Sequence, residues 1–552
     1  MGNVRTDSVE KPSRAALVLL TGLCAAWFAM AMGPFFVGPA EWDDNLYCDM
    51  AAVPRADASI QSRYVHIWTL RLFNGVVPSR RTAAAAYSAI TVIGLMGIAY
   101  PVGRRLGGTG CGLLAAALMP LYPPLLKYLT VPYCDEPMAM WSAAALLAAM
   151  AAAHTTANRS RTIAVVACGL CCFLSAKCKE TGLAVLPAVA FLLWSCDGRL
   201  KVLARWLGGL LAGWIGLTLL DLIFLKQPGF SWRWSTYFPP PPPPGGAAPG
   251  AGVTNRMSAE YVGMLLSRSY LGFSLVGVAG LLAVFRQNRT ARGLALWLFG
   301  VTAFESAVSC YFRGLHALDR YCVAIGVPLV LFSACWIVIQ WRREDVREGG
   351  TSIGLIAVLL GVLMVAGYGL VVELTEGLKS GPIRTRISFF VLPLAVVVLF
   401  AVPWLTSRRW LVRASLVVLL AFSTIPGIGE TLRYAESSRE KLKPWVELAA
   451  AMDRGDADLA LWKLPEKPFA RFRVERRARS LSAKPASGIH VRVAGSLDAV
   501  KENEWLFTDA RWWQSDTPES ADMQSRGWRP FVAGGEQGQG FVVCRRNAGL
   551  SP

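Results

Sequence analysis

The chain has 552 residues, of which 54% are hydrophobic and 17% are charged. This composition excludes an ordinary soluble globular protein, in which about 25% of residues are charged. The formal net charge of +19 would suit a nucleic-acid-binding protein, but the basic residues lie in short clusters between apolar stretches. We therefore expect an integral membrane protein that does not bind nucleic acid.

Apolar stretches that approach the thickness of a bilayer recur along the chain. We count about thirteen of roughly 15–24 residues, close to the length that a membrane-crossing helix needs. They are 15–38, 82–100, 109–126, 136–153, 162–176, 181–196, 205–225, 270–285, 293–311, 321–340, 352–373, 387–406 and 409–426. Two of them, 162–176 and 181–196, are short, and are either tilted partners or a re-entrant pair. The first stretch lacks a small-residue cleavage site, so we interpret it as an anchor.

Arg and Lys clusters occupy every second connection between these stretches. They are Arg5 with Lys11 and Arg14, Arg104-Arg105, Arg159 with Arg161, Arg199 with Lys201 and Arg205, Arg286 with Arg289 and Arg292, Arg342-Arg343, and Arg408-Arg409. This alternation follows the positive-inside rule. It predicts a cytoplasmic N-terminus and, with an odd number of spans, an extracytoplasmic C-terminus. We expect a multi-pass protein of a bacterial inner or plasma membrane.

Two predicted outer connections are long. The first, 39–81, mixes apolar and basic residues in a way typical of short amphipathic helices that lie in the membrane interface. The second, 226–268, contains six consecutive prolines, Pro239 to Pro244. Such a run must form a stiff polyproline II segment. It is either a plain spacer or the edge of a lid over a substrate cleft.

Charges and turn residues increase after about residue 430, so we divide the chain there. Residues 1–429 are predicted to form the transmembrane catalytic domain, and 430–552 a small extracytoplasmic α+β domain. The second region begins with a helix-like segment, 436–452. The strand-like segments that follow are 459–464, 489–493, 504–507 and 541–544, and 529–545 has the pattern of a closing hairpin.

Charged residues gather on the predicted outer side of the membrane, where carboxylates are costly and usually functional. The four groups are Asp43-Asp44, Asp135-Glu136, Lys177 with Lys179 and Glu180, and Arg313 with His316, Asp319 and Arg320. Acids and bases that meet at one membrane face suit a site that holds a phosphate-linked substrate and removes a proton from an acceptor. Glu305, within a predicted span, is either a further functional group or an interhelical contact.

Each group also has a structural interpretation. The two aspartates near residue 43 would then cap an interfacial helix, and Asp135, shortly before Pro137, would be an N-cap. The two lysines would be interface anchors. Arg320 would pair only with its neighbour Asp319.

Cysteines and metal ligands leave two questions open. Cys48, Cys134 and Cys178 fall on the predicted outer side, and the sequence does not show whether two of them form a disulfide. No metal-ligand spacing is present on the outer face. Paired carboxylates there are nevertheless suitable ligands for Mg²⁺ or Mn²⁺.

Four sequence pieces occur in order along the chain. They are Glu41-Trp42-Asp43-Asp44-Asn45-Leu46-Tyr47, Pro78 to Arg81 followed by Gly103 to Gly108, Met119 to Met140 with Asp135 inside it, and Arg320-Tyr321 followed by Pro328. Through these pieces, residues 15–340 resemble the GT-C glycosyltransferases, specifically the branch of protein O-mannosyltransferases and lipid A aminoarabinose transferases. The acidic pair in that family is commonly Asp-Glu, whereas here it is Asp-Asp. Which carboxylate is the base therefore stays open.

The resemblance implies an inverting transfer of a sugar from a polyprenyl-phosphate donor to an extracytoplasmic hydroxyl on a glycolipid, a polymer or a protein. The residues expected to be catalytic are Asp43, Asp44 and Asp135. Those expected to bind substrate are Glu136, Lys177, Lys179, Glu180, Arg313, His316, Arg320 and Tyr321. The alternatives are a transporter or flippase of a lipid-linked saccharide, and a non-catalytic scaffold. The predicted architecture is a polytopic α-helical GT-C-like membrane protein.

Overall fold

The computed structural model describes most of the helical region and parts of the C-terminal region. The described residues are 13–39, 42–54, 63–194, 196–232, 270–286, 288–311, 319–342, 409–453, 458–461, 481, 491–494, 496–500, 504–509, 518–526, 528–536 and 539–546. The proline run and the apolar stretches 352–373 and 387–406 lie outside them.

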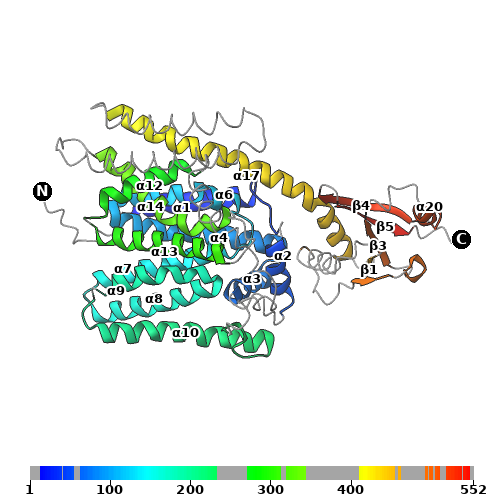
Figure 1. The fold of residues 1–552 in the computed structure, drawn as a ribbon, viewed down its shortest axis with the longest axis horizontal. Coiled ribbons are helices and arrows are strands. Elements are labelled where there is room, and N and C mark those ends of the chain that lie inside the picture. The colour runs from blue at the N-terminus through cyan, green and yellow to red at the C-terminus, as the bar shows by residue number, and fades with distance from the viewer. Residues whose placement is uncertain are drawn as a thin grey trace, which may run out of the picture.

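Within these ranges the N-terminal part is a bundle of helices (Figure 1). Six segments are long and apolar enough to cross a membrane: α1 (Arg14–Met32), α4 (Arg80–Gly107), α7 (Asp135–His154), α8 (Asn158–Cys178), α10 (Arg199–Leu225) and Arg320–Trp341. The last consists of η5 (Asp319–Cys322) and most of α14 (Val323–Arg342). The other bundle elements are α5 (Thr109–Leu118), η2 (Met119–Leu121), α6 (Pro123–Lys127), η3 (Glu180–Val185), α9 (Leu186–Leu193), η4 (Phe230–Trp232), α12 (Leu271–Val284) and α13 (Arg289–Tyr311). A polytopic helical membrane protein is thus confirmed, whereas thirteen spans are not.

Small residues let two of the helices approach closely. A Cβ on Gly169 of α8 would lie 2.1 Å from the carbonyl oxygen of Trp206 on α10, and a Cβ on Gly209 would lie 2.1 Å from that of Val166. Close backbone contact through glycine is typical of helices packed in membranes. The other side of α10 exposes apolar side chains such as Leu200, as expected of a surface that faces lipid.

Two helices of the first long outer connection lie at the end of the bundle nearest the C-terminal sheet (Figure 1). They are α2 (Trp42–Ala52) and α3 (Tyr64–Val76), in agreement with the prediction of short helices. Tyr64 and Leu70 of α3 are buried, whereas Leu72 is 58% exposed. The buried side of α3 packs on α4 and α8, so this connection forms one wall of the site described below.

One long helix joins the bundle to the sheet. α17 (Arg409–Asp453) passes residue 430 without a break, and the helix predicted at 436–452 is its end. The strands are β1 (Asp458–Leu461), β2 (Val491–Val493), β3 (Glu504–Asp509), β4 (Trp528–Glu536) and β5 (Gln539–Arg546), and α20 (Pro518–Ser525) precedes β4. They form one mixed sheet in the order β2-β1-β3-β5-β4. β1 is parallel to β2 and β3, and β5 is antiparallel to β3 and to β4, its partner in the predicted hairpin.

Candidate active site

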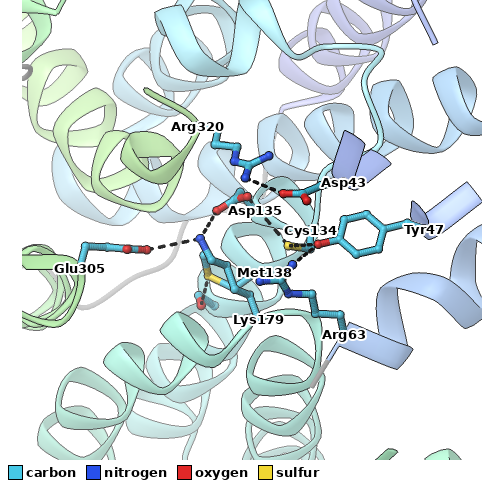
Figure 2. A network of polar contacts seen from close by, with 10 residues as sticks. Asp43, Tyr47, Arg63, Cys134, Asp135, Met138, Lys179, Glu305 and Arg320 are labelled. Atoms are coloured by element: carbon cyan, nitrogen blue, oxygen red, sulfur yellow. Dashed lines mark hydrogen bonds and ion pairs between the residues drawn. The ribbon is translucent and has the colours of Figure 1, made fainter. Parts of the chain in front are cut away.

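Charged side chains from five separate elements meet at one place (Figure 2). Asp43 comes from α2 and Asp135 from the first residue of α7, while Lys179 directly follows α8. Glu305 projects from α13, and Arg320 belongs to η5 just before α14. Residues separated by up to 277 positions in the chain therefore form a single network.

Lys179 is the buried centre of this network. Its Nζ lies 2.5 Å from Oδ1 of Asp135 and 3.6 Å from Oε1 of Glu305. The same Nζ lies 3.8 Å from the centroid of the Tyr321 ring, a cation–π distance. Burial lowers the pKa of Lys179, but the two carboxylates outweigh this effect and raise the pKa above its ordinary value. The ammonium group is therefore charged at neutral pH.

Arg320 and Asp43 form the more open half of the network. Nη2 of Arg320 donates to Oδ2 of Asp43 at 2.6 Å. The guanidinium carbon lies 4.5 Å from the ring centroid of Tyr133 and 5.3 Å from that of Tyr321. The Asp43 side chain is 30% exposed, against 2% for Asp135 and 4% for Glu305. Asp43 is therefore the carboxylate of this network that an incoming molecule reaches most easily.

Asp44 has a different environment from Asp43. It is fully buried, and its Oδ1 accepts a hydrogen bond from the backbone N–H of Asn45 at 2.7 Å. Because α2 begins at Trp42, Asp43 and Asp44 both lie in its first turn, where the helix dipole favours carboxylates. The two candidates for the base thus differ in environment: one is partly exposed beside a cation, and the other is enclosed.

Asp135 is the first residue of α7. Pro137 lies in the first turn of α7, where its missing N–H costs no helical hydrogen bond. The N-cap is Cys134 and not Asp135. Asp135 therefore does not have the predicted capping role, and its carboxylate pairs with Lys179 instead.

The end of α8 is held against α7. The hydroxyl of Ser175 donates to the carbonyl of Met138 on α7 at 2.9 Å and lies 2.7 Å from the hydroxyl of Ser142. The chain then turns back on itself, and a Cβ on Gly182 would come within 2.4 Å of the Ser175 side chain. Only glycine fits this close approach, so Gly182 allows η3 to pack against the end of α8.

Other predicted residues lie elsewhere or outside the described part. Lys177 is buried, but its Nζ donates to the backbone carbonyl of Ser231 at 3.0 Å, away from the ion pairs of Lys179. Glu180 is half-buried in η3. Arg313, His316 and the side chain of Asp319 are not among the described residues. The alternative that Arg320 pairs only with Asp319 is wrong, since Arg320 contacts Asp43.

Glu136 and Glu305 are both buried carboxylates. No hydrogen-bond partner for either carboxylate oxygen of Glu136 is present among the described residues. Glu305, for which the sequence left two interpretations, makes an interhelical contact with Lys179. Only the fold shows that this contact is also part of the charged network.

Tyr133 and Tyr47 were missed by sequence reasoning. Tyr133 lies beneath Arg320, and the hydroxyl of Tyr47 accepts a hydrogen bond from Arg63. The available signals were that Tyr133 is two residues before Asp135 and that Tyr47 ends the first of the four sequence pieces. Aromatic residues near the ends of spans are so common that these signals had little weight.

The histidine and the cysteines near the site have structural environments. Both ring nitrogens of His66 have partners, at 3.0 Å from the Tyr87 hydroxyl and at 3.1 Å from the Pro132 carbonyl oxygen. Burial lowers the pKa of His66 to about 3, so the ring is neutral. The three cysteines of the predicted outer side are buried free thiols, without the disulfide that the sequence left open: Cys48, Cys134 and Cys178.

The described residues contain no group of three or more His, Cys, Asp or Glu suited to hold a metal ion. In the charged network, Asp135 and Glu305 already share the Lys179 ammonium. The sequence-based suggestion of Mg²⁺ or Mn²⁺ therefore has no ligand set in this part of the chain.

Comparison with known proteins places this geometry in context. Residues 63–220 match a family model described as dolichyl-phosphate-mannose-protein mannosyltransferase. The structure is similar to crystal structures of ArnT from Cupriavidus metallidurans. The apo form aligns with a TM-score of 0.50 at 12% identity, over 96% of this chain and 98% of ArnT. The form bound to undecaprenyl phosphate aligns with a TM-score of 0.52 at 13% identity, over 98% of this chain and 100% of ArnT.

The fold is that of the GT-C glycosyltransferases. An oligosaccharyltransferase from Archaeoglobus fulgidus shows a weaker similarity, with a TM-score of 0.47 at 10% identity over 88% of this chain and 65% of that protein. A search of curated protein sequences found no match. The resemblance read from the four sequence pieces is thus confirmed.

Proposed function

We propose that this GT-C protein transfers a sugar from a polyprenyl-phosphate donor to an acceptor hydroxyl outside the cytoplasm, with inversion at the anomeric carbon. The observation that carries the proposal is a partly exposed carboxylate, Asp43, in contact with the Arg320 guanidinium, while the buried Lys179 ammonium belongs to the same network through Asp135. A base and an anion-binding group side by side are what this reaction requires.

The proposed chemistry is a single displacement. The acceptor oxygen attacks the anomeric carbon on the face opposite the phosphate and forms the new glycosidic bond. The bond between that carbon and the phosphate oxygen breaks, and its electron pair leaves with the polyprenyl phosphate. Asp43 takes the proton of the attacking hydroxyl, which increases the nucleophilicity of the oxygen.

Two cations stabilise the charge that develops on the leaving phosphate. A guanidinium has several N–H donors in a planar fork, so Arg320 is able to contact Asp43 and a phosphate at the same time. Lys179 acts as a point charge behind it, and its pairs with Asp135 and Glu305 hold its position. The polyprenyl tail would lie between apolar helices. Glycolipids, polymers and proteins all remain as acceptor classes.

We expect Arg320→Lys to raise the apparent donor KM by about tenfold or more, since charge-assisted contacts to the phosphate are lost. Lys179→Arg should have a smaller effect. Lys177→Arg is the matched control, because Lys177 bonds to Ser231 and not to this network. The measurement is release of polyprenyl phosphate by the purified protein at saturating acceptor, with the donor titrated.

A normal donor curve for Arg320→Lys would remove Arg320 from the phosphate site. Movement of a lipid-linked saccharide across the bilayer without release of polyprenyl phosphate would favour the transporter alternative.

The orientation in the membrane is a second testable part of the proposal. We expect reporter fusions after Arg105 and after Asp453 to give opposite signals, cytoplasmic and extracytoplasmic, because the Arg clusters alternate between the two sides. Asp453 is a suitable C-terminal fusion point, because α17 ends there and the fusion leaves that helix whole. Identical signals would contradict an extracytoplasmic site.

A further inference from the structure

One stripe of α17 contacts both the bundle and the sheet. Its buried residues recur every three or four positions: Thr431, Ala435, Ser438, Leu442, Trp445, Leu448 and Ala449. Ala435 and Leu442 share an apolar cluster with Tyr128 and Tyr133 of the bundle. One turn further, the Trp445 ring lies 5.7 Å from Phe507 of β3. A single unbroken helix therefore connects the sheet to the aromatic residues beside the candidate site.

Three tyrosine rings lead from α17 to Arg320. Tyr434 of α17 lies 6.0 Å from Tyr128 at an interplanar angle of 81°, and Tyr128 lies 5.1 Å from Tyr133 at 89°. Both pairs have the edge-to-face arrangement that aromatic rings favour. The face of Tyr133 in turn lies 4.5 Å from the guanidinium carbon of Arg320. The first ring of this series thus belongs to α17 and the last supports the cation that we assign to the donor phosphate.

A second contact from α17 reaches the chain that leads to Asp43. Arg439 donates to the backbone carbonyl of Pro34. Three residues further along the chain, the N–H of Val37 donates to the hydroxyl of Thr130 at 3.0 Å. α17 thus contacts the chain segment that precedes α2 as well as the tyrosine series.

We propose that Tyr434 is a positioning residue for donor binding: through Tyr128 and Tyr133 it holds the Arg320 guanidinium in place. α17 thereby couples the C-terminal sheet to the site. This inference rests on the proposed function, since the ligand of Arg320 is taken to be the phosphate of a polyprenyl donor. Tyr434 itself is half-buried, and its ring lies next to Tyr128 and the Lys127 ammonium.

The test measures binding of undecaprenyl phosphate to the purified full-length protein without acceptor. Tyr434→Leu removes the ring and should weaken binding by about three- to tenfold, the range expected for one edge-to-face pair. Tyr434→Phe retains the ring and should bind normally. Leu432→Ala, at a position that is 41% exposed on the same helix, is the matched control. The thermal midpoint of each variant verifies folding, and Tyr434→Met provides a second ringless variant.

A double-mutant cycle separates positioning from general packing. In the Arg320→Lys background, Tyr434→Leu should change binding by less than about twofold, because its effect acts through the guanidinium. An equal loss in both backgrounds, or no loss in either, would overturn the inference while leaving the proposed function in place. No binding of undecaprenyl phosphate by the unsubstituted protein would overturn both.

Discussion

Asp43→Asn should lower the turnover number by about 10²–10⁴-fold, the usual effect of removing a general base. The amide keeps the size of the side chain and still accepts a hydrogen bond from Arg320, but it does not take up the proton of the acceptor. Asp43 is the accessible carboxylate of the network, at 30% exposure. The measurement is single-turnover sugar transfer with donor and acceptor both saturating.

Asp44→Asn is the control for this experiment. Asp44 is fully buried and accepts from the N–H of Asn45, a bond that an amide oxygen replaces. We expect turnover within about tenfold of the unsubstituted protein, since only the general base should show the larger loss. Normal turnover in both variants would mean that Asp43 and Asp44 only stabilise the first turn of α2. A large loss confined to Asp44→Asn would reverse the assignment of the base.

Lys179→Met should lower the free energy of unfolding by about 3–5 kcal/mol, because it leaves buried carboxylates without their partner. Asp135 and Glu305 are 2% and 4% exposed, so water does not replace the lost ammonium. The thermal midpoint in detergent measures this loss. Lys201→Met, on the exposed side of α10, is the matched control and should stay within about 0.5 kcal/mol.

A second substitution shows whether the cause is electrostatic. Adding Glu305→Gln to Lys179→Met removes one of the two buried carboxylates, while the other, Asp135, keeps its electrostatic attraction to Arg320. We therefore expect the double variant to recover part of the lost stability. If it is less stable than Lys179→Met alone, the lysine contributes through packing, and the account of the charged network is wrong.

The sequence alone determined the class of this protein, many of its described apolar helices and the approximate positions of the C-terminal strands. Such features depend on neighbouring residues along the chain. The polarity of the side chains on each face of a helix or strand follows the environment of that face, whether lipid, water or protein core. The same reasoning gathered Asp43, Asp135, Lys179 and Arg320 as candidates, since helices that alternate in direction return their outer ends to one side. The structure brings these four side chains together in one network.

Only the tertiary structure decided which of these neighbours touch. Lys177 and Lys179 are two positions apart and look equivalent in the sequence, yet one bonds to Ser231 and the other to Asp135. Likewise Asp43 and Asp44 are adjacent, but one meets Arg320 and the other is enclosed. The direction of a side chain at a helix end depends on the last backbone angles and on packing by distant helices. Neither is encoded in the local pattern, so the pairing became visible only in the folded chain.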